Sequence, residues 1–140
     1  MTTRFLRTTL LPLFVAVVAG CGGPPEPGPT DTGARDAVRA YADAVVRHDW
    51  PAGYALLAPE ARKAWPPAEF ARRGDAYRQK LGFDPTAVHV RTCEERGGDA
   101  TARIDFAGNA AGRHHFKETL TLRRTDGRWA VVLPARFGQR

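Results

Sequence analysis

The stretch Thr119–Pro134 reads TLTLRRTDGRWAVVLP and holds the clearest structural signal in the chain. Apolar and polar residues alternate before Asp126-Gly127, and an apolar run follows it over residues 129–133. The dipeptide is typical of two-residue turns between antiparallel strands. Pro134 has no amide hydrogen to donate to a neighbouring strand, so we expect the second strand to run from Trp129 to Leu133. The stretch therefore predicts a β-hairpin.

The alternation of the first hairpin strand extends upstream to Phe116, and two more alternating runs occupy residues 88–91 and 102–106. Gly97-Gly98-Asp99 separates these two runs and is typical of another turn. The second half of the chain therefore predicts four antiparallel strands.

Helical spacing dominates the first half of the body. Apolar residues recur every three or four positions from Ala34 to Val45, with charged residues between them, which predicts an amphipathic helix. Asp31 or Thr32 is expected to cap its start.

Two shorter helices are predicted after the first. Asp49 is suited to cap a second helix that runs through Leu57, and Ala58-Pro59 is expected to end it. A third helix is predicted between Pro67 and Gly82, and Gly74 is expected to weaken its middle. Its apolar side is formed by Phe70, Ala71, Tyr77 and Leu81.

This order of elements predicts an α+β fold in which three N-terminal helices pack on a curved antiparallel sheet of about four strands. The chain has 140 residues, 43% of them apolar, and a net charge of +6. That length suits one ordinary domain and excludes a large multidomain enzyme. Two cysteines, Cys21 and Cys93, are too few for a disulfide scaffold.

The first 20 residues have the layout of a secretory signal peptide. Arg4 and Arg7 precede an apolar run over residues 8–19, and small residues follow it. Val18-Ala19-Gly20-Cys21 resembles the bacterial lipobox, in which the cysteine receives a diacylglycerol group and becomes the first residue of the mature protein. The resemblance implies lipidation of Cys21 and a cell-envelope location, with the body on the extracytoplasmic side of a membrane. The alternatives are an ordinary signal peptide with a chance cysteine, or a 12-residue segment that sits in the membrane but is short for a true span.

Residues 21–33 are expected to tether the body to that anchor. The segment Gly22–Gly33 reads GGPPEPGPTDTG and has no aliphatic residue to bury. At ~2 to 3 Å per residue it would hold the body about 20 to 30 Å from the bilayer. Removing Arg4 and Arg7 with the signal peptide leaves 19 cations against 15 acids, a mature net charge of +4. With Cys21 lipidated, Cys93 has no partner for an intramolecular disulfide, so we expect a buried thiol, with a reactive or intermolecular one as the alternative.

Residues 34–140 resemble the nuclear transport factor 2-like superfamily, which has a cystatin-like, cone-shaped fold. The resemblance rests on AVRAYADAVVRHDW (37–50), YALLAPEAR (54–62) and the hairpin TLRRTDGRWAVV (121–132). It implies a bent sheet wrapped around the first helix, with a pocket between them, and homodimers are common in that superfamily. Because its members include isomerases, dehydratases, polyketide cyclases and non-catalytic binding modules, the fold alone does not identify a function.

Polar residues on the inner side of the predicted sheet are the candidates for chemistry. Counting by two from Phe116 places His114 and Glu118 with the core residues of that strand, and a buried carboxyl group with a raised pKa suits a general acid or base. The alternative for Glu118 is an ion pair at the rim of the sheet. His115 is expected on the opposite face from His114, and Asp105 on the surface in an ion pair with Arg91 or Arg103.

His48-Asp49 is interpreted as a helix end, where His48 meets the helix dipole, with a catalytic dyad as the alternative. The spacing of the four histidines and the spare thiol predicts no metal site and no cofactor. Arginines spread along the whole chain do not suggest nucleic-acid binding. Aromatic candidates for the pocket lining are Tyr41, Trp50, Tyr54, Phe106, Phe116 and Trp129.

The sequence thus favours a membrane-anchored extracytoplasmic lipoprotein that acts as a non-catalytic ligand-binding or accessory module. A small apolar ligand or an envelope protein is the expected partner, and self-association into a homodimer is a further hypothesis. The alternative is a small pocket enzyme, similar to an isomerase, dehydratase or cyclase, that uses Glu118 and His114 as acid and base.

Overall fold

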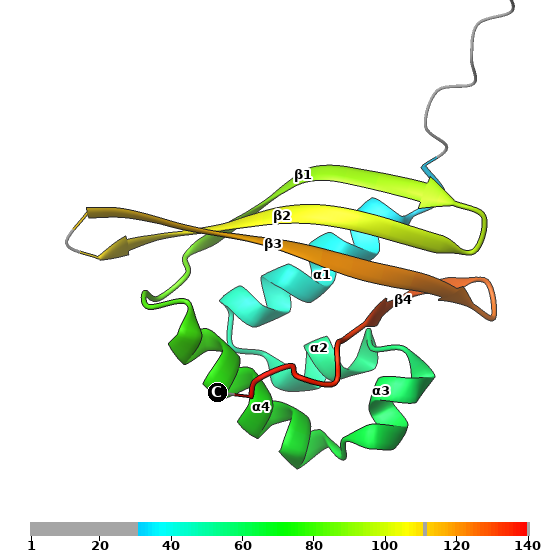
Figure 1. Ribbon diagram of the computed structural model, residues 1–140, viewed down its shortest axis with the longest axis horizontal. Coiled ribbons are helices and arrows are strands. Elements are labelled where there is room, and N and C mark those ends of the chain that lie inside the picture. The colour runs from blue at the N-terminus through cyan, green and yellow to red at the C-terminus, as the bar shows by residue number, and fades with distance from the viewer. Residues whose placement is uncertain (1–30, 111, 140) are drawn as a thin grey trace, which may run out of the picture.

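The computed structural model describes residues 31–110 and 112–139. Four helices are followed by four strands, as Figure 1 shows. Their bounds are α1 (Ala34–Val46), α2 (Trp50–Ala55), α3 (Pro59–Ala64), α4 (Pro67–Lys80), β1 (Ala87–Arg96), β2 (Asp99–Ala110), β3 (Gly112–Thr125) and β4 (Arg128–Val132). The predicted signal peptide, Cys21 and most of the predicted tether lie outside the described residues. None of the helices in the described ranges is long and apolar enough to cross a membrane.

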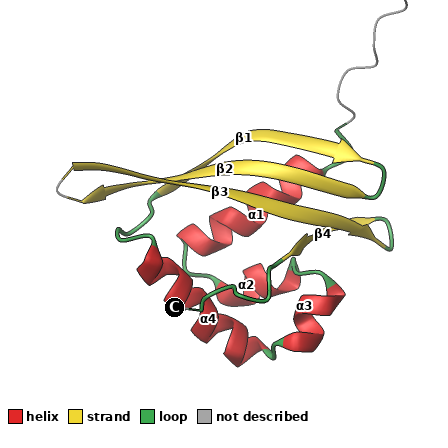
Figure 2. Cartoon of the chain, viewed as in Figure 1, coloured by secondary structure: helices red, strands yellow, loops and turns green. Residues whose placement is uncertain are grey.

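The four strands form one sheet in the order β1-β2-β3-β4, and every neighbouring pair is antiparallel. The predicted four-stranded antiparallel sheet is therefore confirmed. All four helices lie on the same side of it (Figure 2). We call the side that faces the helices the inner face and the opposite side the outer face.

The described residues form one helix more than the three that the sequence predicted. The second helix ends at Ala55, two residues before the predicted Leu57, which instead bridges to Val131. Pro59 does not end α2 but is the first residue of α3. Proline is favourable in a first helical turn, because its fixed φ suits the helix and its missing amide hydrogen needs no partner there. The apolar spacing of this six-residue helix was too short to detect.

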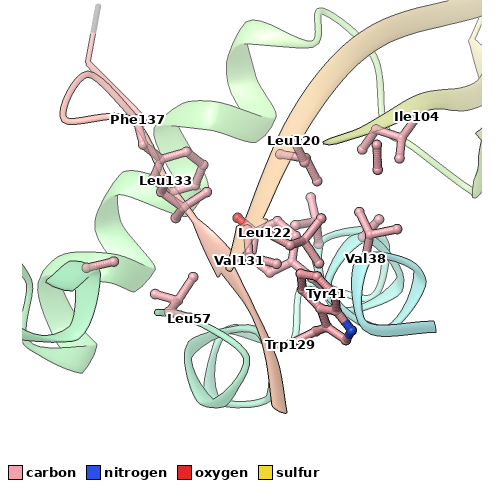
Figure 3. Close-up of a cluster of buried hydrophobic side chains, with 14 of the residues drawn as sticks. Val38, Tyr41, Leu57, Ile104, Leu120, Leu122, Trp129, Val131, Leu133 and Phe137 are labelled. Carbon is pink, nitrogen blue, oxygen red and sulfur yellow. The ribbon is translucent and has the colours of Figure 1, made fainter. Parts of the chain in front are cut away.

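The core fills the space between α1 and the inner face of the sheet. The five apolar residues predicted for the first helix, Ala34, Val38, Tyr41, Ala42 and Val45, are all buried. The alternating residues of β2 and β3 meet them, and Figure 3 shows Val38 and Tyr41 opposite Ile104 and Leu122. The period-two and helical patterns therefore identified the correct inner surfaces.

The start of α1 is stabilised differently from the prediction. Neither Asp31 nor Thr32 is the N-cap; Gly33 takes that position and has no side chain. The Glu95 carboxylate of β1 accepts hydrogen bonds from the Thr32 amide at 2.9 Å, the Thr32 hydroxyl at 2.7 Å and the Ala34 amide at 3.2 Å. The acceptor for the free amides of α1 therefore comes from a strand more than 60 residues away.

Two other local predictions are confirmed. The Asp49 side chain accepts a hydrogen bond from the Ala52 amide at 3.1 Å and caps α2. Asp126 and Gly127 both adopt positive φ angles, 50° and 76°, as a two-residue hairpin turn of this kind requires.

Gly74 has a packing role in α4 that its low helix propensity concealed. A Cβ atom at this position would lie 2.6 Å from the Trp50 ring. The absence of a side chain therefore lets α2 and α4 approach each other, with Trp50 edge-on to Phe70 at 5.9 Å between ring centroids.

Replacement of Glu95 tests the capping of α1. Although partial burial opposes ionisation, hydrogen bonds from Thr32 and Ala34 hold the pKa of Glu95 below its usual range. The contribution of Glu95 to the free energy of unfolding is therefore present at neutral pH and is lost as the pH falls through its folded-state pKa. We expect Glu95→Ala to lower the melting temperature at pH 7, with a smaller difference from wild type in acid. Replacing the exposed neighbour Glu94 by alanine should leave the melting temperature unchanged at both pH values. Equal losses from both variants would contradict the capping role.

Replacement of Gly74 by alanine tests the contact with Trp50. Alanine favours a helix by about 1 kcal/mol over glycine, but overpacking typically costs about 1 to 3 kcal/mol. We expect Gly74→Ala to lower the free energy of unfolding, measured by denaturant titration. In a Trp50→Phe background the smaller ring should reduce that cost, and an identical cost in both backgrounds would exclude the ring contact as its cause.

Candidate functional site

Three polar side chains meet inside the cone, the space between the inner face and the helices: Tyr41 of α1, Tyr77 of α4 and Glu118 of β3. Glu118 points inward because it alternates with Lys117 and Thr119, and it pairs in register with the buried Ile104. The Tyr77 hydroxyl donates a hydrogen bond to the Glu118 carboxyl group. The Tyr41 hydroxyl is buried and has no hydrogen-bond partner among the described residues.

Burial controls the protonation of this cluster. It raises the pKa of Glu118, while the hydrogen bond from Tyr77 opposes that shift. It also raises the pKa of Tyr41 and of Tyr77, and the nearby Glu118 adds to both shifts. Both tyrosines therefore remain protonated and able to donate, and Glu118 is held closer to neutrality than an exposed glutamate.

The space beside this cluster is small. A cavity of about 10 Å³ is lined by Tyr41, Tyr77, Ile104, Phe106, Glu118, Leu120, Leu133, Pro134 and Phe137. A cavity needs about 10 to 15 Å³ to hold one water molecule. The cone of this structure therefore has room for about one water and not for an organic substrate.

The segment after β4 closes the cone. Phe137 is buried and stacks on Phe70 at 5.9 Å and on Tyr77 at 5.2 Å between ring centroids. Its carbonyl accepts a hydrogen bond from Arg73 Nη1 at 3.0 Å. Leu133 lies beside Phe137 in Figure 3, and both line the cavity. The segment after β4 thus fills the space beside the Glu118 cluster.

The structure does not bring His114 and Glu118 together. They lie four positions apart along β3, or about 13 Å at ~3.3 Å per residue. His114 stacks on Phe83 at 5.7 Å, with the ring planes 20° apart. His115 faces the outer side, as predicted, and its Nδ1 lies 3.3 Å from Asp105.

The aromatic candidates lie in several places. Tyr41 and Phe106 line the cavity, and Phe116 contacts Tyr77 at 6.5 Å between ring centroids. Trp50 and Tyr54 instead pack against Phe70 between α2 and α4. Trp129 donates a hydrogen bond from its indole to the Thr32 hydroxyl.

Sequence reasoning missed two aromatic residues of the cavity lining, Tyr77 and Phe137. The helical spacing of α4 had placed Tyr77 on the apolar side of its helix, but nothing in the spacing identified its partner Glu118. Phe137 follows Pro134, where neither helical nor strand spacing continues, so no periodic signal was available for it.

Asp105 differs from the prediction in one respect. It forms the predicted ion pair with Arg91, at 2.8 Å, but it is buried and only 2% exposed, not a surface residue. The register of β1 shifts between Val90 and Thr92, and Arg91 at this bulge covers the carboxylate. The hydrogen bond from Arg91 lowers the pKa of Asp105, burial opposes this shift, and His115 adds to it.

The remaining candidates have structural partners. His48 pairs with Asp75 of α4 at 2.6 Å, and Asp75 also accepts a hydrogen bond from the Trp50 indole at 2.8 Å. Asp49 caps α2 and so forms no dyad with His48. Cys93 is half-buried, and its pKa is raised by burial. Within the described ranges, no three His, Cys, Asp or Glu side chains are grouped as a metal site would require.

Comparisons with known proteins support the fold. The sequence matches no family model and no curated protein. Among solved structures, a protein from Campylobacter jejuni described as an NTF2-like transpeptidase matches with a TM-score of 0.55 and 11% identity, over 71% of this chain and 96% of that one.

A SEC-C motif containing protein from Rhodopseudomonas palustris matches with a TM-score of 0.54 and 19% identity, over 71% of this chain and 77% of that one. At these identities the likeness concerns the fold alone. The chain therefore has a nuclear transport factor 2-like α+β fold, with four helices on one face of an open four-stranded antiparallel sheet.

Proposed function

We propose that this protein is a lipid-anchored extracytoplasmic module whose cone is not catalytic. Diacylglycerol on Cys21 would hold it at a membrane of the cell envelope, and residues 22–33 would space the body from the bilayer. Support for the anchor comes from the basic start, the apolar run and Val18-Ala19-Gly20-Cys21. The body then acts as a binding or accessory domain.

The closed cone is the observation that carries the non-catalytic assignment. A substrate pocket commonly has a volume of about 300 to 1,000 Å³, far above the roughly 10 Å³ found beside Glu118. The carboxyl group of Glu118 is already engaged by Tyr77. Buried contacts of Phe137 with Phe70 and Tyr77 would have to break before a ligand could enter.

One observation favours a second function, that of a small pocket enzyme. A carboxyl group with a raised pKa beside a tyrosine donor and an unpartnered tyrosine hydroxyl is a suitable acid or base cluster. In that enzyme Tyr77 takes the place that the sequence suggested for His114. Catalysis would require the segment around Phe137 to move out of the cone.

Lipidation is tested by labelling cells with radioactive palmitate. We expect label in the wild-type protein and its recovery in the membrane fraction, since the acyl chains anchor it. The Cys21→Ala variant should lose both the label and its recovery in the membrane fraction. The control is Cys93→Ala, which removes the other thiol and should remain labelled. An unlabelled wild-type protein, or label that depends on Cys93, would overturn the anchor.

Replacement of Glu118 by glutamine tests whether an ionised carboxyl group destabilises the interior of the cone. Burial raises the pKa of Glu118, so its ionisation destabilises the fold as the pH rises through the folded-state pKa. We expect Glu118→Gln to melt above wild type at pH 7, and the difference to vanish in acid below the usual pKa of glutamate. Thermal unfolding across a pH series measures this.

A variant at the exposed Glu94, changed to glutamine, is the matched control and should follow wild type at every pH. A lower melting temperature for Glu118→Gln at neutral pH would show that the ionised carboxylate stabilises the cone. Loss of a measured turnover with the fold intact would favour the enzyme instead.

A further inference from the structure

A second concavity lies on the outer face of the sheet, away from the cone. It has a volume of about 440 Å³ and crosses β1, β2 and β3. Its outward side chains are Arg91, Arg103, Asp105, Lys117 and Thr119. Ile104 and Glu118 complete the lining, but alternation directs their side chains to the inner face.

The strand register assembles this group. Lys117 of β3 lies directly opposite Asp105 of β2, and Thr119 of β3 lies opposite Arg103 of β2. Opposed residues on antiparallel strands have Cβ atoms about 4.5 to 5.5 Å apart, so these side chains are immediate neighbours.

The bulge at Arg91 brings the third cation into the group. Arg91 Nη2 lies 2.8 Å from Asp105, whose side chain is only 4% exposed. On the inner side, Arg35 of α1 donates a hydrogen bond to the Val90 carbonyl at 3.1 Å, next to the bulge. The buried Asp105 therefore fixes the position of Arg91 at the edge of the concavity.

The concavity carries a surplus of positive charge. Arg91, Arg103 and Lys117 are cations at neutral pH, and Asp105 is the single carboxylate among the outward side chains, so two positive charges remain. Within the described part of the chain, Arg103 and Lys117 form no ion pair. Both are exposed, so their charged groups are available to a ligand.

Two other cations that point to the outer face are already paired, and Arg128 lies on β4, outside the concavity. Arg96 pairs with Glu94, and Arg123 pairs with Asp99 and Glu60. A long polyanion would need a continuous row of free cations. A second copy of the chain placed face to face would bring the same cations together, which is unfavourable. A compact group with two negative charges matches the surplus.

We propose that this outer concavity binds the phosphate monoester group of a small soluble molecule. Arg103 and Lys117 contact the phosphate oxygens through charge-assisted hydrogen bonds, Arg91 completes the positive rim, and the Thr119 hydroxyl donates a further bond. A phosphate monoester carries close to two negative charges at neutral pH. This site depends neither on the lipid anchor nor on the closed cone.

Isothermal titration of the full chain, in non-ionic detergent at constant ionic strength, tests the site. The probes are inorganic phosphate and glycerol 3-phosphate, and uncharged glycerol is the blank. We expect saturable binding of both phosphates and none of glycerol. The double variant Arg103→Ala and Lys117→Ala should weaken binding by about tenfold or more, since two charge-assisted contacts are lost.

The matched control is Arg96→Ala, which removes an outer-face cation outside the concavity and should leave the affinity unchanged. Circular dichroism confirms that the variants are folded. Absence of saturable phosphate binding by wild type would overturn the proposal, as would an equal loss in the Arg96 variant. Binding to vesicles containing phosphatidic acid without binding of either soluble phosphate would assign the surface to a membrane and overturn it as well.

Discussion

Successive side chains of β2 and β3 point to opposite faces of the sheet, and this alternation determines which face each polar group of these two strands occupies. Ile104 packs beneath α1, while its neighbour Asp105 lies on the outer face. Glu118 enters the cone between Lys117 and Thr119, which face outward. A shift of one residue in either strand would exchange the two sets and place charges in the core.

The two faces of the sheet favour different protonation states of their buried carboxyl groups. Inside the cone, burial favours the neutral form of Glu118, and Tyr77 supplies a hydrogen bond without charge. On the outer face, Asp105 is also buried, but Arg91 and His115 favour its ionised form. The inner face therefore suits a closed, apolar interior, whereas the outer face keeps a net positive charge that is open to solvent.

Periodicity predicted the elements well because it depends only on neighbouring residues. The apolar stripe of α1, the Asp49 cap, the Asp126-Gly127 turn and the inward direction of Glu118 were all visible in the sequence. The six residues of α3 were not, since so short a segment shows less than two helical turns. The proposed lipid anchor lies outside the described residues and stays a prediction.

Apart from the short α3, the sequence by itself determined which elements form, which of their faces are apolar and which carboxyl group turns inward, since these follow from the spacing of residues along one segment. Only the tertiary structure decided which residues far apart in the sequence contact one another. Glu95 caps a helix whose first residue lies 61 residues away, Tyr77 reaches Glu118 from another layer, and Phe137 fills the cone. A bulge in β1 delivers Arg91 to Asp105. Contacts between distant segments depend on strand register and helix packing, which no local pattern encodes.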